Sequence, residues 1–382
     1  MSTIKTAKGV LYELKKAGYE AYIVGGAVRD YLLRMPINDV DITTNARPHQ
    51  VNKIFRTIPT GLKYGTLTVL YKDEKFEVTT YRIDGEYQDD RHPDNVTFSE
   101  DVQEDVKRRD FTINGLLLSD KQEIIDFVEG QKDLKAKLIR TIGDPHQRFN
   151  EDALRMMRAF YFQSKLGFQI ETQTRDAIFE LKDNLKNVAM ERIVNEMIKI
   201  IQGEHAKRAF KSMVTTQVHE VLPGLKKGIE HILTMDDMPF VDSFFALCFT
   251  LNDGIVPQEW TFSNKHRHRY QQAAVLARKT KVFDAYYLYT YGIDLCLLAN
   301  KVNFMLDRSK NLKSEIEETY QNLPIQSELD LKLRATEMIE ITGKKAGAWL
   351  KDMQHQMVLA VLKKEMKNDK ESLIEFLNKN IK

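Results

Sequence analysis

The clearest signal in the sequence is Tyr22-Ile-Val-Gly25-Gly26-Ala-Val-Arg29-Asp30, which Asp39-Val-Asp41-Ile follows after a turn at Pro36. A hydrophobic run ends in the two glycines, and a short amphipathic helix with Arg29 in its first turns is expected next. Glycines let a ligand approach the backbone, so bare N–H groups and a guanidinium would face whatever lies beyond the strand. This combination suits a triphosphate.

Three acidic residues have the pattern of a metal site. Asp39 and Asp41 lie two apart in an apolar run, and the two-residue period of a strand is expected to place both carboxylates on one face. Neighbouring hard oxygen ligands bind magnesium. Two-metal phosphoryl transfer needs a third carboxylate, which Glu77 supplies from another alternating segment. The sequence therefore predicts Asp39 and Asp41 as Mg²⁺ ligands and Glu77 as the third catalytic acid.

Each of these motifs also has a simpler explanation. A Gly-Gly pair can be a plain loop, and Asp-x-Asp can be a solvated strand end. Together, in this order and spacing, the glycine pair, the aspartate pair and the apolar-flanked acid resemble the nucleotidyltransferase superfamily that includes DNA polymerase beta. The chemistry that they indicate is nucleotide transfer.

Length and composition limit the remaining possibilities. The 382 residues are enough for two to four domains, each with its own core. The net formal charge is only +2, so any nucleic-acid contact must come from local basic patches. The two cysteines lie in apolar segments and imply no disulfide framework. No apolar run reaches the about 18 residues that a membrane span needs, so we expect a cytoplasmic protein without a membrane partner, and the sequence names no protein partner.

Periodicity predicts an α/β arrangement at the N-terminus. Helices are expected over 4–16 and 48–55, and a hairpin over 65–71 and 75–81 would carry Glu77 back toward the two aspartates. Ser99 is expected to cap a further helix over 100–109. The intervening polar, aperiodic stretch is either a bland linker or a functional lid.

Polar side chains are dense in Arg108-Arg109-Asp110-Phe-Thr-Ile-Asn114-Gly115. Beside a metal site, Arg109 could hold a triphosphate and Asp110 could accept a hydrogen bond from a ribose hydroxyl. The alternative is a structural corner made of caps and salt bridges.

A second polar group lies in Glu151-Asp152-Ala-Leu-Arg155-Met-Met-Arg158, whose spacing is expected to place Asp152, Arg155 and Arg158 along one side of a helix. The simpler explanation is i,i+3 salt bridges worth about 0.2–0.5 kcal/mol. The functional one is base selection, because a carboxylate accepts from the exocyclic amine of cytosine or adenine while a guanidinium donates to the neighbouring ring nitrogen. Guanine and uracil present the opposite pattern and would leave buried polar groups unpaired, at about 1–3 kcal/mol each.

With this segment the sequence resembles the bacterial-type tRNA nucleotidyltransferases that add CCA to tRNA ends, and the related poly(A) polymerases. Residues 24–30 with 39–41 resemble the family's metal and triphosphate motif, 108–114 its ribose motif and 151–155 its base-templating motif. The resemblance implies nucleotide binding by Gly26, Arg29, Arg109, Asp110, Asn114, Asp152, Arg155 and Arg158.

Two further segments resemble the same family. Residues 82–98 are similar to its flexible loop, with Asp84 and Arg91, which takes part in the change from adding C to adding A. Residues 191–196 resemble the helix that braces the templating residues. The chain departs from the family pattern at His92 in place of a second Arg, Gly115 in place of Ala, and Tyr161 where an arginine row often continues after Arg158.

The resemblance implies an α+β fold, with a nucleotidyltransferase head built on a small mixed β-sheet and helices, followed by an all-α neck, body and tail. The expected parts are a catalytic head over 1–143, a neck with the templating helix over 144–203, a body over 204–300 and a tRNA-binding tail over 301–382. Basic clusters at 264–270 and 278–281 are either solvated helix faces or phosphate contacts.

The activity that the resemblance implies is template-independent addition of C, C and A to tRNA from CTP and ATP, with Mg²⁺ as cofactor. The tRNA 3′-hydroxyl would attack the α-phosphate and release pyrophosphate. A poly(A) polymerase would share every head motif, and a CC-only adding enzyme would have a shortened loop. From a different class, a non-catalytic RNA-binding protein of the same ancestry would lose acids in the head, whereas all three are present.

Overall fold

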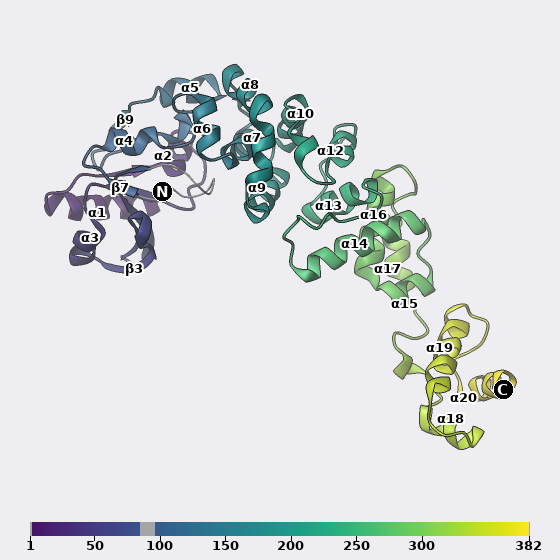
Figure 1. The fold of residues 1–382 in the computed structure, drawn as a ribbon. Helices are drawn as coiled ribbons and strands as arrows, with labels where there is room; N and C mark the ends of the chain where they lie inside the picture. The colour runs from purple at the N-terminus through teal and green to yellow at the C-terminus, as the bar shows by residue number, and fades with distance from the viewer. Residues whose placement is uncertain (1, 85–95, 382) are drawn as a thin grey trace. The chain divides into compact units, whose positions relative to one another are not determined.

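The structure is a computed structural model that describes residues 2–84 and 96–381 (Figure 1). Contacts divide the chain into two compact units, Met1–Leu222 and Pro223–Lys382. Among the described residues, the first unit holds a mixed sheet with helices and the second unit is helical, which confirms the predicted α+β class. No helix in these ranges is long and apolar enough to cross a membrane.

The elements of the first unit come in mixed order along the chain. Its strands are β1 (Ala21–Val24), β2 (Asp41–Thr44), β3 (Arg56–Gly61), β4 (Thr66–Tyr71), β5 (Glu74–Thr80), β6 (Arg82–Asp84), β7 (Val96–Phe98), β8 (Leu116–Leu118), β9 (Ile124–Asp126), β10 (Leu138–Ile139) and β11 (Gln169–Ile170). Its helices are α1 (Ser2–Lys16), α2 (Gly26–Leu32), α3 (Pro48–Ile54), α4 (Val102–Lys107), α5 (Gly130–Ala136), α6 (Pro145–Glu151), α7 (Leu154–Leu166), α8 (Thr172–Leu181), α9 (Met190–Gln202), α10 (Ala206–Thr215) and α11 (Val218–Val221).

The elements of the second unit are all helical. They are α12 (Lys226–Ile232), α13 (Val241–Leu251), α14 (Asn264–Lys279), α15 (Ala285–Tyr291), α16 (Ile293–Met305), α17 (Lys313–Gln321), α18 (Ala335–Thr342), α19 (Ala348–Leu362) and α20 (Lys370–Asn380).

Seven strands form one mixed sheet in the order β3-β4-β5-β2-β1-β8-β9. The predicted hairpin is present as β4 and β5, and β2 runs parallel to β5. This register pairs Asp41 with Glu77, so two of the predicted acids lie on neighbouring strands. The edge strand β3 was not predicted, because it is mostly exposed and contains Pro59, and its hydrophobic pattern is weak.

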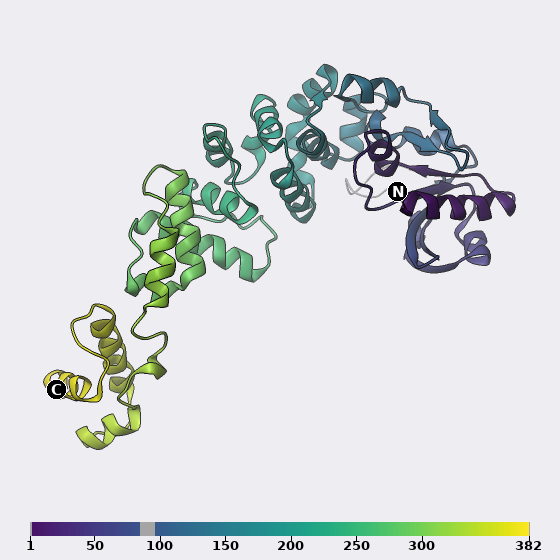
Figure 2. The same cartoon turned by 180° about the vertical axis from the view of Figure 1, so that it is seen from behind.

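Helices pack against this sheet and hold it rigid. On α4, Val102 and Val106 pack against Val24, Tyr81 and Leu117 of the sheet region. The helix α1 packs against β1 and β5, and the view from behind shows it lying in front of the sheet (Figure 2). Burial of apolar side chains of this size contributes about 1.5–3 kcal/mol each. The strand ends that carry the acids are therefore part of a packed scaffold.

The helix expected over 100–109 is shorter and has a different cap. It is α4, and Asp101 is its N-cap, because the carboxylate accepts a hydrogen bond from the Gln103 N–H at 2.8 Å. Ser99 instead accepts from the Asp101 N–H at 2.9 Å and shapes the preceding turn. The prediction of Ser99 as the cap was wrong. A carboxylate also interacts more favourably than a hydroxyl with the positive end of a helix.

Strand pairing and close helix packing connect the sheet region to the helices that follow. The strands β10 and β11 pair in parallel, so residues on either side of Gly143 belong to one small sheet. The helix α7 packs against α9 and α10. At Gly203, between α9 and α10, a Cβ would lie 2.0 Å from the Ser164 Oγ, so only glycine permits this approach. The four-part division into head, neck, body and tail remains a prediction.

The second unit contains two apolar clusters. Phe245 and Phe249 of α13 pack against Trp260, whose Nε1 donates to the Pro223 carbonyl at 2.7 Å. A separate core, with Met357 and Leu373 fully buried, joins α18, α19 and α20. Trp349 packs partly buried against this core. Both cysteines of the chain are free and buried, as expected for small core residues.

Candidate active site

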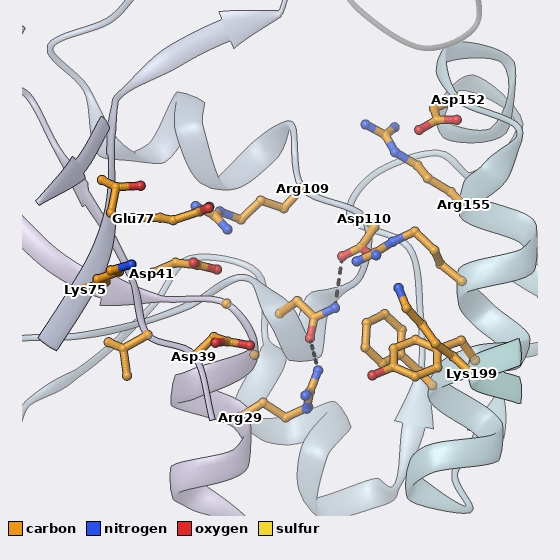
Figure 3. Close-up of a pocket in the computed structure, with 18 residues that line it drawn as sticks. Arg29, Asp39, Asp41, Lys75, Glu77, Arg109, Asp110, Asp152, Arg155 and Lys199 are labelled. Carbon is orange, nitrogen blue, oxygen red and sulfur yellow. Dashed lines mark hydrogen bonds and ion pairs between the residues drawn. The ribbon is translucent and has the colours of Figure 1, made fainter. Parts of the chain in front are cut away.

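One cavity of the first unit, about 850 Å³ in volume, gathers the predicted site residues (Figure 3). Its lining is Gly25, Gly26, Arg29, Asp39, Val40, Asp41, Thr68, Lys75, Glu77, Arg109, Asp110, Asn114, Asp152, Arg155, Arg158, Tyr161, Phe162 and Lys199. Every residue predicted for catalysis, and every nucleotide-binding residue predicted outside the flexible loop, is in this set. Of the two loop residues, Asp84 ends β6 and Arg91 lies outside the described residues.

The three predicted acids face the cavity from the sheet side (Figure 3). Asp41 begins β2 and pairs with Glu77 of β5, whereas Asp39 precedes the strand, so the expectation that one strand carries both aspartates was wrong. Burial raises the pKa of Asp41, and the nearby carboxylates of Glu77 and Asp39 raise it further, while Arg109 opposes them. Asp41 therefore senses the charge of the other two acids.

Crowded carboxylates of this kind fit a hard divalent cation, which takes oxygen ligands. Among residues 2–84 and 96–381, no three His, Cys, Asp or Glu side chains already lie close enough together to enclose a metal ion. Burial and then the neighbouring carboxylates disfavour the ionised form of Asp41 and raise its pKa, and a bound cation would offset both effects. The donor set that would hold it is Asp39 and Asp41, with Glu77 beside them.

Gly25 separates an acid from a guanidinium at the mouth of the glycine turn. Its φ of +75° is a conformation that residues with side chains rarely adopt. A Cβ on Gly25 would lie 3.5 Å from the Arg109 Nη1 and 4.0 Å from the Asp41 Oδ2. A side chain here would therefore enter the space between these two groups, which the bare backbone leaves open.

The guanidinium of Arg29 makes more contacts with other side chains than its place in the glycine motif suggested. It donates to Asp30 at 2.8 Å and to the side-chain oxygen of Asn114 at 2.6 Å, and it is buried. Its Cζ also lies 5.1 Å from the centre of the Phe162 ring. Arg29 thus links α2 to the polar segment that follows α4, and it also lines the cavity.

Asp110 is held by four hydrogen bonds. One oxygen accepts from the Phe111 N–H and the Asn114 amide, and the other accepts from the Arg158 Nε and Nη2 at 2.8 and 2.5 Å. Burial acts to raise its pKa, but Arg158 and the hydrogen bonds outweigh burial and lower it. A ribose hydroxyl that donates to Asp110 would have to add to these four hydrogen bonds or replace one of them.

A residue that the sequence analysis did not select, Asp105, fixes the arginine pair. It is fully buried and accepts from Arg108 at 2.7 Å, from Arg109 at 3.0 Å and from the Thr43 hydroxyl at 3.1 Å. Burial acts to raise its pKa, but the two guanidiniums lower it to about 2. The only sequence signal was its spacing of three and four from the arginines, which fits any surface salt bridge equally well. The Nε of Arg109 is buried without a partner among the described residues, and so is available to an acceptor.

The templating segment differs from the expected single helix. Asp152 is the C-terminal cap residue of α6, with extended backbone, and α7 begins only at Leu154. Its Oδ1 accepts from the Leu154 N–H at 3.0 Å, and its Oδ2 accepts from Arg192 of α9 at 2.8 Å. The prediction that Asp152, Arg155 and Arg158 share one helix was wrong, because Asp152 lies in the break between two helices. All three nevertheless line the cavity.

Arg155 is positioned by backbone as well as by charge. Its Nη1 donates to Glu151 at 2.7 Å and to the Arg148 carbonyl at 3.1 Å, and its Nη2 donates to the Arg108 carbonyl at 3.0 Å. Figure 3 shows Asp152 and Arg155 next to each other at the far end of the cavity from Asp39. An acceptor and a donor thus stand side by side in fixed orientations.

Several other lining residues were not selected from the sequence. Lys75 lies two residues before Glu77 on β5, and strand alternation could have indicated that both face one side. Thr68 is paired with Glu77 across the hairpin. Phe162 and Lys199 carry ordinary helical spacing and gave no distinguishing signal.

Family models match most of the chain. Residues 21–140 match the Poly A polymerase head domain, 167–229 match the probable RNA and SrmB-binding site of polymerase A, and 245–377 match the putative tRNA nucleotidyltransferase domain 2. Fold and site therefore define a nucleotidyltransferase whose head is of the poly(A) polymerase type.

Curated relatives and solved structures narrow this class. The chain is 35% identical over 387 residues to a CCA-adding enzyme of Bacillus cytotoxicus, covering 98% of each protein, and 36% identical over 385 residues to one of Bacillus velezensis, covering 96% of each. The crystal structure of the Bacillus stearothermophilus CCA-adding enzyme in complex with CTP matches with a TM-score of 0.82 and 32% identity, covering 98% of this chain and 96% of that one. The chain belongs to the family of CCA-adding enzymes, which are tRNA nucleotidyltransferases, and the resemblance noted in its sequence is confirmed.

Proposed function

We propose that this protein adds C, C and A to the 3′ end of tRNA from CTP and ATP, releasing pyrophosphate and using no nucleic-acid template. The observation that carries the proposal is the content of one cavity. Three carboxylates line its sheet side, and an acceptor–donor pair lines its helical side (Figure 3). Similarity to CCA-adding enzymes over almost the whole chain supports the same function.

Members of the family use a divalent metal, and we propose Mg²⁺ held by Asp39 and Asp41, with Glu77 in support. A bound cation of this kind would neutralise phosphate charge and lower the pKa of the attacking 3′-hydroxyl. The chain's own contribution is to hold two of the three carboxylates in register, through the pairing of Asp41 with Glu77. The pKa of Asp41, raised by burial and by the other two acids, means that protons compete with the cation at low pH.

Selection of the base belongs in this proposal to Asp152 and Arg155. The Asp152 carboxylate would accept from the exocyclic amine of cytosine or adenine, and the Arg155 guanidinium would donate to the neighbouring ring nitrogen. The Arg192 contact to Asp152 and the Arg108 carbonyl contact to Arg155 support it, because a selecting pair must be rigid. Guanine and uracil would instead place an acceptor against the Asp152 carboxylate and a donor against the Arg155 guanidinium, so neither contact could form a hydrogen bond.

The remaining predicted residues would hold the sugar and phosphates. Arg109 has a buried Nε without a partner among the described residues, which suits an anionic oxygen. Asp110 and Asn114 would contact the ribose, while Gly26, Arg29 and Arg158, which also line the cavity, would contact the phosphates. A role for Asp84 and Arg91 in the change from C to A stays a proposal from family resemblance.

The second unit would bind tRNA through exposed lysines rather than through most of its arginines. In the cluster 264–270, Arg267 donates to backbone carbonyls and Arg269 pairs with Asp242, which are structural roles. In the cluster 278–281, Lys279 and Lys281 are exposed beside a hollow of about 690 Å³. Because its substrate would be cellular tRNA, a cytoplasmic location remains part of the proposal.

The test is incorporation of labelled CMP and AMP on a tRNA that lacks its terminal CCA. We expect two C and one A to be added, with sharp arrest afterwards. Long A tails would identify a poly(A) polymerase, and arrest after two C would identify a CC-only enzyme. Asp39→Ala should abolish incorporation, and its persistence would contradict both the metal site and the catalytic role.

A further inference from the structure

Two residues of the cavity, Tyr161 and Lys199, have no role in the proposed reaction so far. Both line the cavity from its helical side, Tyr161 on α7 and Lys199 on α9. The Lys199 Nζ lies 5.5 Å from the centre of the Tyr161 ring, and it pairs with Glu196 at 2.9 Å. The ammonium therefore rests between a ring face and a carboxylate at the border of the cavity.

The aromatic rings of Tyr161 and Phe162 connect Lys199 with two other cations. The rings of Tyr161 and Phe162 lie 4.9 Å apart. The guanidiniums of Arg29 and Arg158 lie 5.1 and 5.3 Å from the Phe162 ring. Three positive side chains thus border one wall, spaced by two aromatic rings.

Lys199 differs from its cationic neighbours in its freedom to move. Arg29 is buried against Asp30 and Asn114, and Arg158 donates two hydrogen bonds to Asp110. The Lys199 side chain is 48% exposed, and Glu196 accepts one of the three ammonium hydrogens, which leaves two donors for a ligand. A lysine of this kind acts as a mobile point charge that suits phosphate.

Its position favours the phosphate end of the cavity over the base end. Arg29, which belongs to the glycine motif, is connected to it through the two rings. Figure 3 shows Lys199 on the helical side of the cavity near Asp110, with Asp39 across from it and with Asp152 and Arg155 at the other end of that side. A nucleotide whose base lies at Asp152 would extend its phosphates away from that end, between this wall and the acids of the sheet side.

We propose that Lys199, supported by the face of Tyr161, binds the terminal phosphates of the nucleoside triphosphate and of the pyrophosphate product. The inference rests on the proposed function. It places the positive charge of Lys199, from α9, beside Tyr161, which carries no charge. Lys199 is a substrate-binding residue, and Tyr161 is a positioning residue that acts through it.

The experiment measures direct binding by the full-length protein in magnesium buffer, with CTP, CMP, inorganic pyrophosphate and tRNA as separate probes. Lys199→Met keeps the length of the side chain and removes its charge. We expect about tenfold weaker binding of CTP and pyrophosphate, with CMP and tRNA unchanged. Lys199→Arg should recover most of the loss, and Tyr161→Leu should show a smaller loss with the same selectivity for probes. The matched control is Lys132→Met, which removes an exposed i,i+3 partner of Glu129 and should change none of the four.

Unaltered CTP and pyrophosphate binding by Lys199→Met would overturn the proposal. A change confined to tRNA would overturn it as well, because the phosphate contacted would then belong to the RNA. Since binding is measured without turnover, this result is independent of the incorporation assay that tests the proposed function. A thermal unfolding curve identical to that of the wild type will show that the variant is folded.

Discussion

Asp105 shows how a single buried carboxylate can organise a site without facing it. It holds Arg108, Arg109 and Thr43 together behind the cavity wall. Because its pKa in the folded protein is lowered, the ionised form stabilises the fold. The contribution is transmitted to the site through Arg109, which is the only one of these partners that lines the cavity.

The substitution Asp105→Asn should destabilise the folded protein by about 2 kcal/mol at pH 7. The pKa of Asp105 is lowered from 3.8 to about 2, so the contribution is fully present above about pH 4 and is lost as the pH falls toward 2. Urea denaturation at a series of pH values should show the wild type and the variant converging in acid. A difference that stays constant between pH 7 and pH 2.5 would contradict the assignment.

The substitution Gly25→Ala should lower kcat/KM for CTP by at least about tenfold. The new methyl group would stand between Arg109 and Asp41, and the positive φ would add about 1–3 kcal/mol of backbone strain. Gly18→Ala is the matched control, because Gly18 also has a positive φ but its Cβ would meet nothing within 4 Å. Both variants should lose stability, and only Gly25→Ala should lose activity. Equal activity in the two would show that the glycine is needed for its backbone alone.

At the scale of elements, the break between α6 and α7 determines where the Asp152 carboxylate lies. It releases Asp152 from helical geometry, so that its carboxylate can contact both the first turn of α7 and Arg192 of α9. A continuous helix would have aligned Asp152 with Arg155, as the spacing suggested. The Asp152 and Arg155 side chains are therefore positioned by three elements together.

The substitution Arg192→Gln should weaken base selection more than catalysis. Asp152 would lose a charged partner, which is worth about 1.5–3 kcal/mol, and could rotate. We expect the preference for CTP over UTP, measured as the ratio of kcat/KM values, to fall by about tenfold. Arg175→Gln, which removes an exposed pair with the adjacent Asp176, serves as the control and should leave the ratio unchanged. Intact discrimination in Arg192→Gln would mean that Asp152 does not need this brace.

The packing of α7 sets the position of the whole helical wall. Gly203→Ala should destabilise the fold by more than about 2 kcal/mol, because its Cβ would lie 2.0 Å from the Ser164 Oγ and 2.7 Å from the Ser164 carbonyl oxygen. Gly347→Ala is the control, since its Cβ would meet nothing closer than 3.6 Å. Thermal unfolding of the two variants gives the comparison. A Gly203→Ala protein as stable as Gly347→Ala would show that α7 shifts freely.

On the scale of the whole molecule, the two units differ in what they contain. The first contains the complete cavity, and the second offers exposed basic residues and cores of its own. A net charge of only +2 means that RNA affinity must depend on where the charges are, rather than on their sum.

The double substitution Lys279→Gln with Lys281→Gln should weaken tRNA binding and reduce its salt dependence. Each phosphate contact removed lowers the slope of log Kd against log salt by about 0.7–0.9. CTP binding should stay the same, because these lysines belong to the second unit. Lys132→Gln with Lys135→Gln on α5 removes the same charge elsewhere and is the control. An unchanged slope in the first pair would show that these lysines form a solvated face.

Much of the site was available from local patterns. Strand alternation, the glycine pair and helical spacing indicated the hairpin, the acids and the arginines, because each depends only on residues close in sequence. Local patterns failed where several outcomes had similar local energies. Ser99 and Asp101 are both good caps, and nothing in the spacing of Asp152 revealed the break between α6 and α7.

The sequence by itself determined which chemical groups this protein has and in what order they enter the fold, including three acids, a bare glycine turn and an acid–guanidinium pair. Only the tertiary structure decided their partners: Asp41 beside Glu77, Asp110 with Arg158, Asp152 with Arg192 and Lys199 over Tyr161. The physical reason is that propensity acts over a few residues, whereas the pairing of charges 40 to 48 positions apart depends on how the elements pack.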